Sequence, residues 1–145
     1  MTIGRALRDD HRGMTGKKKI IAVLDDEPKM RRALGRLLKT HGYDVDPFES
    51  ADAFLKDTPS DRPDCMLLDL HMPRTTGFDV LASISFMHSP MPVIVITGHD
   101  EPGYAERVRA LGAADYLLKP LDESVLIAAI ERACPNGSIP SSQKY

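Results

Sequence analysis

The sequence has no tryptophan, and aromatic residues make up only 6% of its 145 residues. Cysteine is also scarce: Cys65 and Cys134 stand alone without a Cys-x-x-Cys spacing, which indicates two reduced thiols rather than a disulfide framework. No apolar stretch is long enough to cross a membrane, and residues 1–19 lack the apolar segment of a secretory signal. We therefore expect a cytoplasmic protein without a membrane partner.

The sequence also has no large excess of charge of either sign. Its 19 basic and 21 acidic residues give a formal net charge of −2, so it lacks the strongly basic composition typical of nucleic-acid-binding domains. We expect no direct contact with nucleic acid. Hydrophobic residues make up 42% of the chain and charged residues 28%, which suits one globular domain with a solvated surface.

The two ends of the chain differ in composition from its middle. Residues 1–17 are polar and basic, and we expect a flexible N-terminal arm there, with Met14 as an alternative start. Residues 135–145 are rich in serine, proline, glycine and asparagine, which is typical of a flexible C-terminal tail. The predicted domain therefore covers residues 18–134.

Within that domain, short apolar runs alternate with segments of helical periodicity. This alternation predicts an α/β fold: a parallel five-stranded sheet in a (βα)5 arrangement, with helices on both faces and right-handed crossovers. The expected strands cover residues 20–24, 43–48, 65–70, 92–96 and 115–118, and the expected helices cover 28–41, 51–56, 78–87, 103–111 and 122–133.

Polar residues follow several of the expected strands. Asp25 and Asp26 follow the first, Asp69 lies near the end of the third, Thr97 follows the fourth and Lys119 follows the fifth. In a parallel sheet these strand ends meet at one edge, where ligands bind. Two carboxylates about 5 Å apart repel each other by roughly 3 kcal/mol at an effective dielectric near 20, and a hard cation such as Mg²⁺ removes that cost. An aspartate beside such a cation can also act as a nucleophile toward phosphorus.

These residues lie in the segments "LDDEP", "LLDLHMPRTTGFDVL", "PVIVITGH" and "ALGAADYLLKP". Together the segments resemble the signature of response-regulator receiver domains of two-component signalling, and the resemblance covers residues 18–134. It implies a flavodoxin-like, doubly wound sheet with strand order 2-1-3-4-5. It also implies a phosphoacceptor signalling domain rather than an enzyme, charged by a sensor histidine kinase or a phosphotransfer protein and acting on a downstream protein target.

The resemblance assigns the metal site and the phosphoacceptor to particular residues. Asp69 would be the phosphoacceptor. Asp26, Asp69 and the backbone carbonyl of His71 would hold Mg²⁺ directly, and Asp25 would act partly through a metal-bound water. The side chain of His71 lies at a position that, in the family, modulates how fast the phosphate is lost.

The resemblance also assigns the phosphoryl contacts and a switch. Lys119 would pair with the phosphoryl oxygens, and the peptide bond between Lys119 and Pro120 would be cis. Thr97 would move toward the phosphoryl group, and Tyr116 would turn inward when it does. His99 flanks Thr97 and could orient or block the water that removes the phosphate.

Three alternatives remain open from the sequence. A Mg²⁺-dependent aspartyl-phosphate hydrolase of the haloacid dehalogenase type needs a second aspartate where this chain has His71. A transition-metal site that includes His71 and His99 is disfavoured because receiver sites use oxygen ligands. The segments also resemble receivers of helix-turn-helix transcription regulators, so the chain is either a stand-alone receiver, which we favour, or a fragment of such a regulator.

Two further features have competing interpretations. Val125, Leu126, Ala129 and Ile130 form an apolar stripe on the last helix, which could support a phosphorylation-dependent homodimer but which we expect to pack in the core. Gly77 is expected to serve a turn of positive φ, with no chemical role.

Overall fold

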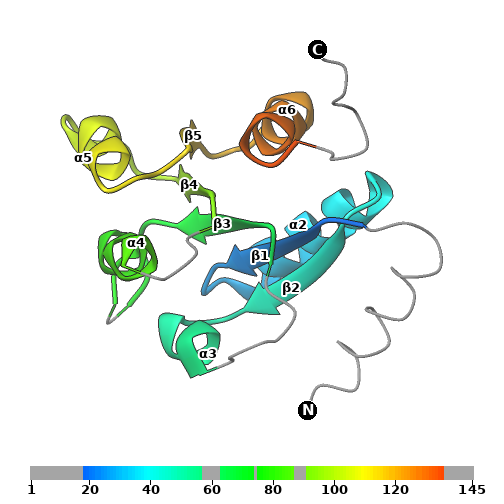
Figure 1. The fold of residues 1–145 in the computed structure, drawn as a ribbon, viewed down its shortest axis with the longest axis horizontal. Coiled ribbons are helices and arrows are strands. Elements are labelled where there is room, and N and C mark those ends of the chain that lie inside the picture. The colour runs from blue at the N-terminus through cyan, green and yellow to red at the C-terminus, as the bar shows by residue number, and fades with distance from the viewer. Residues whose placement is uncertain (1–17, 57–62, 74, 87–90, 136–145) are drawn as a thin grey trace.

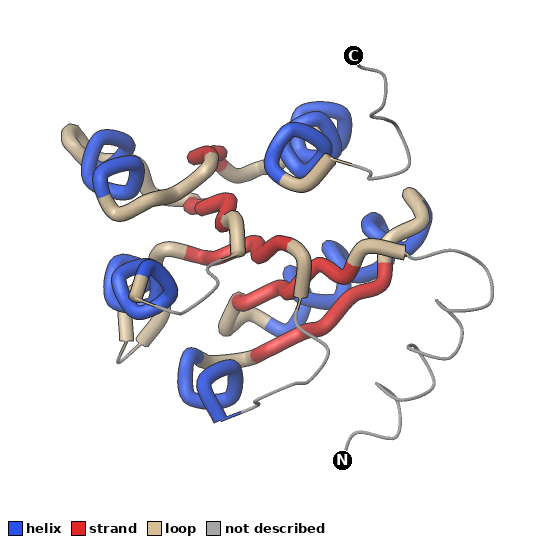
Figure 2. The backbone as a smooth tube through the Cα atoms, viewed as in Figure 1, coloured by secondary structure: helices blue, strands red, loops and turns tan. Residues whose placement is uncertain are grey.

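The computed structural model describes residues 18–56, 63–73, 75–86 and 91–135, and in this part strands alternate with helices (Figures 1 and 2). The predicted N-terminal arm, most of the predicted tail and the predicted helix end at Met87 lie outside the described residues. The strands are β1 (Ile20–Leu24), β2 (Asp44–Phe48), β3 (Cys65–Asp69), β4 (Val93–Thr97) and β5 (Asp115–Leu118), and the helices are α2 (Pro28–Thr40), α3 (Ala51–Lys56), α4 (Gly77–Ser85), α5 (Tyr104–Ala110) and α6 (Glu123–Ala133).

The five strands form one parallel sheet in the order β2-β1-β3-β4-β5, which confirms the predicted fold. β1, β3 and β4 are buried along their whole length. This explains why their sequences are continuous apolar runs: both faces of a central parallel strand are covered by helices. β2 and β5 are the two edges of the sheet.

Helices cover the sheet in two groups. α3, α4 and α5 lie on one face, and α2 and α6 lie on the other (Figure 1). Each group closes its own cluster of buried apolar side chains against the sheet. Leu126, Ala129 and Ile130 of α6 are buried in the second cluster, so the core interpretation of that stripe is confirmed, while Val125 is exposed.

Local sequence signals place the ends of several elements as expected. Pro28 begins α2, and Gly42 follows its end with φ +88°, in the left-handed region that favours glycine. Ser50 Oγ accepts a hydrogen bond from the Ala53 amide, and Asp122 Oδ1 accepts one from the Val125 amide, so both residues cap helices. Thr97 is the last residue of β4 rather than the residue after it, because its backbone continues the ladder with β5.

Cys65 and Cys134 are both buried free thiols, as predicted. Cys65 begins β3 and Cys134 follows α6, yet both belong to the same core cluster. A hydrogen bond with the Cys134 thiol, together with burial, raises the pKa of the Cys65 thiol. The two thiols therefore pack as small apolar side chains in the described structure. Of the helices in the described ranges, none has the length and apolar character that crossing a membrane requires.

Candidate functional site

The register of the sheet brings three carboxylates to one edge. Leu24 of β1 pairs with Leu68 of β3, so the aspartates that follow these two residues arrive side by side. Carboxylate oxygens of Asp25, Asp26 and Asp69 all lie within 4.8 Å of one another. Such an arrangement is costly for ionised groups unless cations offset it.

Asp25 is the most firmly held of the three carboxylates. It is fully buried, and both of its carboxylate oxygens accept hydrogen bonds: Oδ1 from the Glu27 amide at 2.9 Å and Oδ2 from Lys119 Nζ at 3.2 Å. Its backbone carbonyl accepts a further hydrogen bond from Arg31 Nη1 at 2.7 Å. The position of this buried carboxylate is therefore fixed through both its side chain and its backbone.

Asp69 lies at the end of β3 with a side chain that is almost completely buried. Lys119 Nζ lies 3.7 Å from its Oδ1, and the His71 amide donates a weak hydrogen bond of 3.4 Å to the same oxygen. Burial, together with the charge of Asp25, raises the pKa of Asp69 to about 6, although Lys119 and the His71 amide partly offset the shift. Near neutral pH the ionised form predominates, and it carries unfavourable free energy.

Lys119 joins the last strand to this acidic cluster. Its backbone amide donates to the Thr97 carbonyl at 2.8 Å, and its peptide bond to Pro120 is cis, as the resemblance implies. Its ammonium group faces both Asp25 and Asp69. One ammonium group beside three carboxylates leaves net negative charge, which suits a divalent cation with oxygen ligands.

Thr97 and His71 both use the backbone carbonyl of His99. Thr97 Oγ1 donates to it at 3.1 Å and also accepts from the His99 amide at 3.0 Å. His71 Nε2 lies 3.3 Å from the same carbonyl oxygen. The hydroxyl of Thr97 is thus bonded within its own loop, rather than to the acidic cluster.

Tyr116, the predicted aromatic switch, is held by the same loop. Its phenolic oxygen donates a 2.7 Å hydrogen bond to Asp100 Oδ1, and its side chain is only half-buried. Partial burial and this hydrogen bond raise the pKa of the phenol. Because Thr97 binds His99 and Tyr116 binds the next residue, one short segment of backbone connects the two side chains.

The expectation for Gly77 is wrong: the positive φ values in the described glycines belong to Gly42, Gly103 and Gly112. Gly77 is instead required by close approach, since a Cβ atom there would lie 2.7 Å from Leu70 Cα and 2.8 Å from the Asp69 carbonyl oxygen. The Gly77 amide also donates to the Leu70 carbonyl at 2.8 Å. Gly77 therefore holds the chain after Asp69 against the start of α4.

Of the residues singled out in the sequence, Asp25, Asp26, Asp69 and Lys119 are brought together, while Thr97 and Tyr116 bond to the neighbouring loop. Sequence reasoning missed four contributions to the site. They are the Glu27 amide, Arg31, Asp100 and the close packing at Gly77, where the sequence predicted a turn. The proline-ended "DDEP" segment was a signal for the first, because a turn there points amides back at the carboxylate. The other three depend on tertiary contacts.

Comparison with known proteins identifies a family. Residues 21–131 match the response regulator receiver domain. Over 113 residues, 78% of this chain and 55% of the relative, the chain is 36% identical to the transcriptional regulatory protein FixJ of Rhizobium meliloti. Over 122 residues, 84% of this chain and 54% of the relative, it is 34% identical to the response regulator protein TodT of Pseudomonas putida. The chain thus spans about half the length of these curated relatives.

Solved structures agree with the sequence relatives. The crystal structure of FixJ-N superimposes with a TM-score of 0.74 and 35% identity, and the match covers 81% of this chain and 94% of that one. The crystal structure of a response regulator receiver protein from Burkholderia phymatum gives a TM-score of 0.72 and 38% identity over 81% of this chain and 95% of that one.

Proposed function

Because this chain belongs to the response regulator receiver family, we propose that it works by phosphorylation of Asp69. One observation carries the assignment: the nearly buried Asp69 carboxylate lies within 4.8 Å of two other carboxylates and 3.7 Å from the Lys119 ammonium group. Asp25 is less suited to the role because both of its oxygens already accept hydrogen bonds. Asp26 is exposed, so its carboxylate lacks the surrounding contacts that hold a nucleophile in position.

The phosphoryl donor that we propose is a phosphohistidine of a sensor histidine kinase or phosphotransfer protein. An ionised oxygen of Asp69 forms a bond to phosphorus, the phosphorus–nitrogen bond of the donor breaks, and the imidazole leaves with that electron pair. With a pKa of about 6, Asp69 is mostly ionised near neutral pH. Lys119, 3.7 Å away, is placed to pair with a phosphoryl oxygen as charge builds there.

The donor set suits Mg²⁺, since it offers three carboxylates within 4.8 Å of one another and one ammonium group to offset them. We propose that Asp26, Asp69 and the backbone carbonyl of His71 hold the ion and that Asp25 contacts it through water. The ion would neutralise charge on the transferring phosphoryl group. Asp25 would meanwhile keep Lys119 in position through its 3.2 Å hydrogen bond.

The switch that we propose begins with Thr97. To donate to a phosphoryl oxygen on Asp69, Thr97 Oγ1 must leave the His99 carbonyl. That release frees the loop that includes Asp100, and Asp100 holds the Tyr116 hydroxyl outward. The change would therefore reach the surface formed by α5, β5 and α6, where Leu118 and Val125 are each 49% exposed.

The first test is intact-mass spectrometry after incubation with acetyl phosphate and Mg²⁺. We expect one added phosphoryl group on the natural chain and none on Asp69→Asn or in the presence of chelator. The matched control is Glu106→Gln, which removes an exposed carboxylate on α5 and should leave phosphorylation unchanged. Phosphorylation of Asp69→Asn to the same extent as the natural chain would place the acceptor elsewhere.

The coupling between Thr97 and Tyr116 can be tested with the stable phosphoryl analogue beryllofluoride. In protein labelled with 3-fluorotyrosine, we expect beryllofluoride and Mg²⁺ to shift the Tyr116 fluorine resonance, because the Tyr116–Asp100 hydrogen bond is lost. The resonance is assigned with Tyr116→Phe. In Thr97→Ala the shift should be absent, and an unchanged shift in that variant would rule out the proposed route.

The output of the whole protein is also a proposal, because the chain spans about half of its curated relatives. We propose a downstream protein target for the α5, β5 and α6 surface. Phosphorylation-dependent homodimerisation is the second arrangement of that surface, and Val125 is the residue of the predicted stripe that stays exposed for it. Light scattering with and without beryllofluoride separates the two, since only homodimerisation raises the mass of the chain measured alone.

A further inference from the structure

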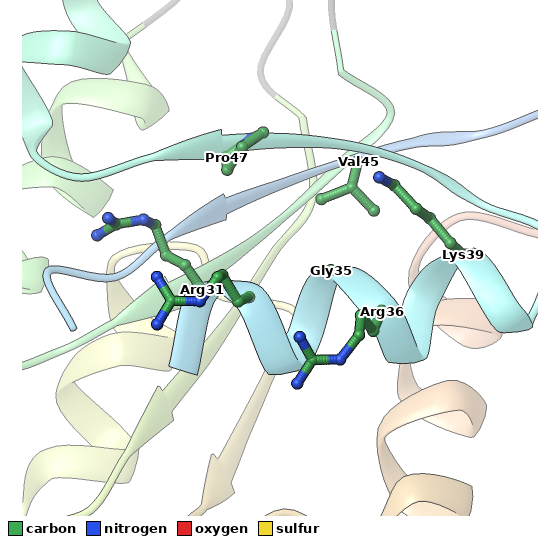
Figure 3. A pocket seen from close by; sticks show the side chains of 7 residues that line it. Arg31, Gly35, Arg36, Lys39, Val45 and Pro47 are labelled. Atoms are coloured by element: carbon green, nitrogen blue, oxygen red, sulfur yellow. The ribbon is translucent and has the colours of Figure 1, made fainter. Parts of the chain in front are cut away.

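A groove that none of the three carboxylates lines runs between α2 and the edge strand β2 (Figure 3). Its floor is formed by Gly35, Val45 and Pro47, and its volume is about 380 Å³. Arg31, Arg32, Arg36 and Lys39 line its walls. Figure 3 shows Gly35 on the side of α2 that faces β2, with Val45 and Pro47 on the strand opposite and Lys39 extending toward Val45.

The charge on α2 is unusual for a chain of net charge −2. The helix carries five basic side chains and no acidic one. Arg32 and Arg36 are four residues apart, and Lys39 follows three residues later, spacings at which like charges repel each other on a helix. Within the described ranges, none of Lys29, Arg32, Arg36 and Lys39 makes an ion pair. The helix thus presents positive charge that its own fold leaves unbalanced.

Gly35 is the second unusual feature. Glycine inside a helix is unfavourable relative to alanine, so a packing reason is expected. The structure provides none: a Cβ atom at Gly35 would meet only Val45 Cγ1, at 3.9 Å, which is ordinary van der Waals contact. The absent side chain instead leaves the floor of the groove open between two basic residues, Arg32 and Lys39, that flank Gly35 on the helix surface.

From these features we infer that the α2–β2 groove binds an acidic peptide segment of a partner protein, with one apolar side chain seated over Gly35 and Val45. The walls complement carboxylates, and the floor complements a hydrocarbon side chain. Pro47 has no amide hydrogen, so the peptide is held by its side chains rather than added to β2 as another strand. A nucleic-acid strand fits less well, because its phosphates would leave the apolar floor of Gly35, Val45 and Pro47 unmatched.

The test uses fluorescence anisotropy of a fluorescein-labelled peptide, Glu-Glu-Leu-Glu-Glu, with the full chain at low salt. We expect saturable binding that weakens as salt increases. A peptide with glutamine in place of every glutamate should bind at least about tenfold more weakly, because the ion pairs are lost. A peptide with glycine in place of the leucine should also bind more weakly, because the floor is then unfilled.

Two variants of equal charge locate the binding surface. Arg32→Glu with Lys39→Glu reverses the walls of the groove and should weaken binding at least about tenfold. It also creates opposite-charge pairs with Arg36, so the helix should remain folded. The control, Lys56→Glu with Arg109→Glu, reverses one exposed lysine and one exposed arginine on α3 and α5 and should change binding less than about twofold.

Two further variants test the role of the groove floor and whether peptide binding is independent of the phosphorylation site. Gly35→Leu fills the floor and should abolish the preference for the leucine peptide over the glycine peptide. Asp69→Asn should bind like the natural chain, because Asp69 does not line the groove. The inference is overturned if the acidic peptide does not bind, if both charge-reversal variants weaken it equally, if Gly35→Leu keeps the preference, or if a labelled single-stranded oligonucleotide binds more tightly than the peptide.

Discussion

At about pH 8 in chelator, Asp69→Asn is expected to raise the free energy of unfolding by about 2 kcal/mol. The cause is the raised pKa of Asp69, which goes from 3.8 for a free side chain to about 6 in the folded chain. Burial and the neighbouring charge of Asp25 make ionisation less favourable in the folded state than in the unfolded one. Asparagine keeps the shape of the side chain but removes the charge.

The sign of this effect depends on pH. The folded state binds the proton of Asp69 more tightly than the unfolded state does, so the ionisation penalty is absent below the unfolded pKa of 3.8. Between 3.8 and about 6 the penalty grows with pH, and above about 6 it is complete. The stabilisation by Asp69→Asn should therefore vanish at about pH 3.5 and reach its full size above about pH 7.

Urea unfolding of both proteins at the two pH values measures the difference. Asp52→Asn is the control, because this exposed carboxylate should change stability by less than about 0.5 kcal/mol. Mg²⁺ should reduce the advantage of Asp69→Asn, since a bound cation stabilises the ionised carboxylate. An advantage that is the same at both pH values would mean that packing, and not charge, causes it.

Gly77→Ala is expected to lower the free energy of unfolding by about 3 kcal/mol. Its Cβ atom would lie 2.7 Å from Leu70 Cα and 2.8 Å from the Asp69 carbonyl oxygen, and both are backbone atoms that cannot turn aside. Relief requires the chain after β3 to move away from α4. Because Asp69 ends β3, directly before the segment that must move, phosphorylation by acetyl phosphate should slow as well.

Gly35→Ala is the matched control for this substitution. Its Cβ atom would meet nothing closer than Val45 Cγ1 at 3.9 Å, and alanine favours the helix by up to about 1 kcal/mol over glycine. Thermal unfolding of the two variants should therefore shift in opposite directions. A similar loss of stability in both would indicate that helix position, rather than backbone contact, sets the cost at Gly77.

The acidic cluster was predictable because the carboxyl ends of parallel strands meet at one edge of the sheet. Once β1 and β3 are assigned as neighbouring parallel strands, Asp25 and Asp69 must meet, and Lys119 arrives with β5. The hydrogen bond of Thr97 was not predictable, since the path of the loop through His99 selects it. Gly77 was misinterpreted for a related reason. A positive φ depends on local sequence, whereas the close approach of Gly77 to Asp69 depends on how the backbone folds back over eight residues.

The α2–β2 groove was likewise predictable only in part from the sequence. The basic residues of α2 are visible in the sequence as a helix without acids. The apolar floor is not, because Val45 and Pro47 come from a strand that only the fold places beside Gly35. A pattern within one element predicts its charge, but a concave site requires two elements.

The position of β2 and β5 at opposite edges of the sheet has a consequence for assembly. A partner anchored through the β2 edge leaves Tyr116 and the rest of the β5 edge accessible. A second segment of that partner, joined by a flexible linker long enough to span the sheet, would then meet the β5 edge at an effective concentration on the order of millimolar. At that concentration a contact too weak to form between separate molecules becomes occupied, and a small change in its affinity changes occupancy strongly. The sheet thus allows constant tethering at one edge and conditional engagement at the other.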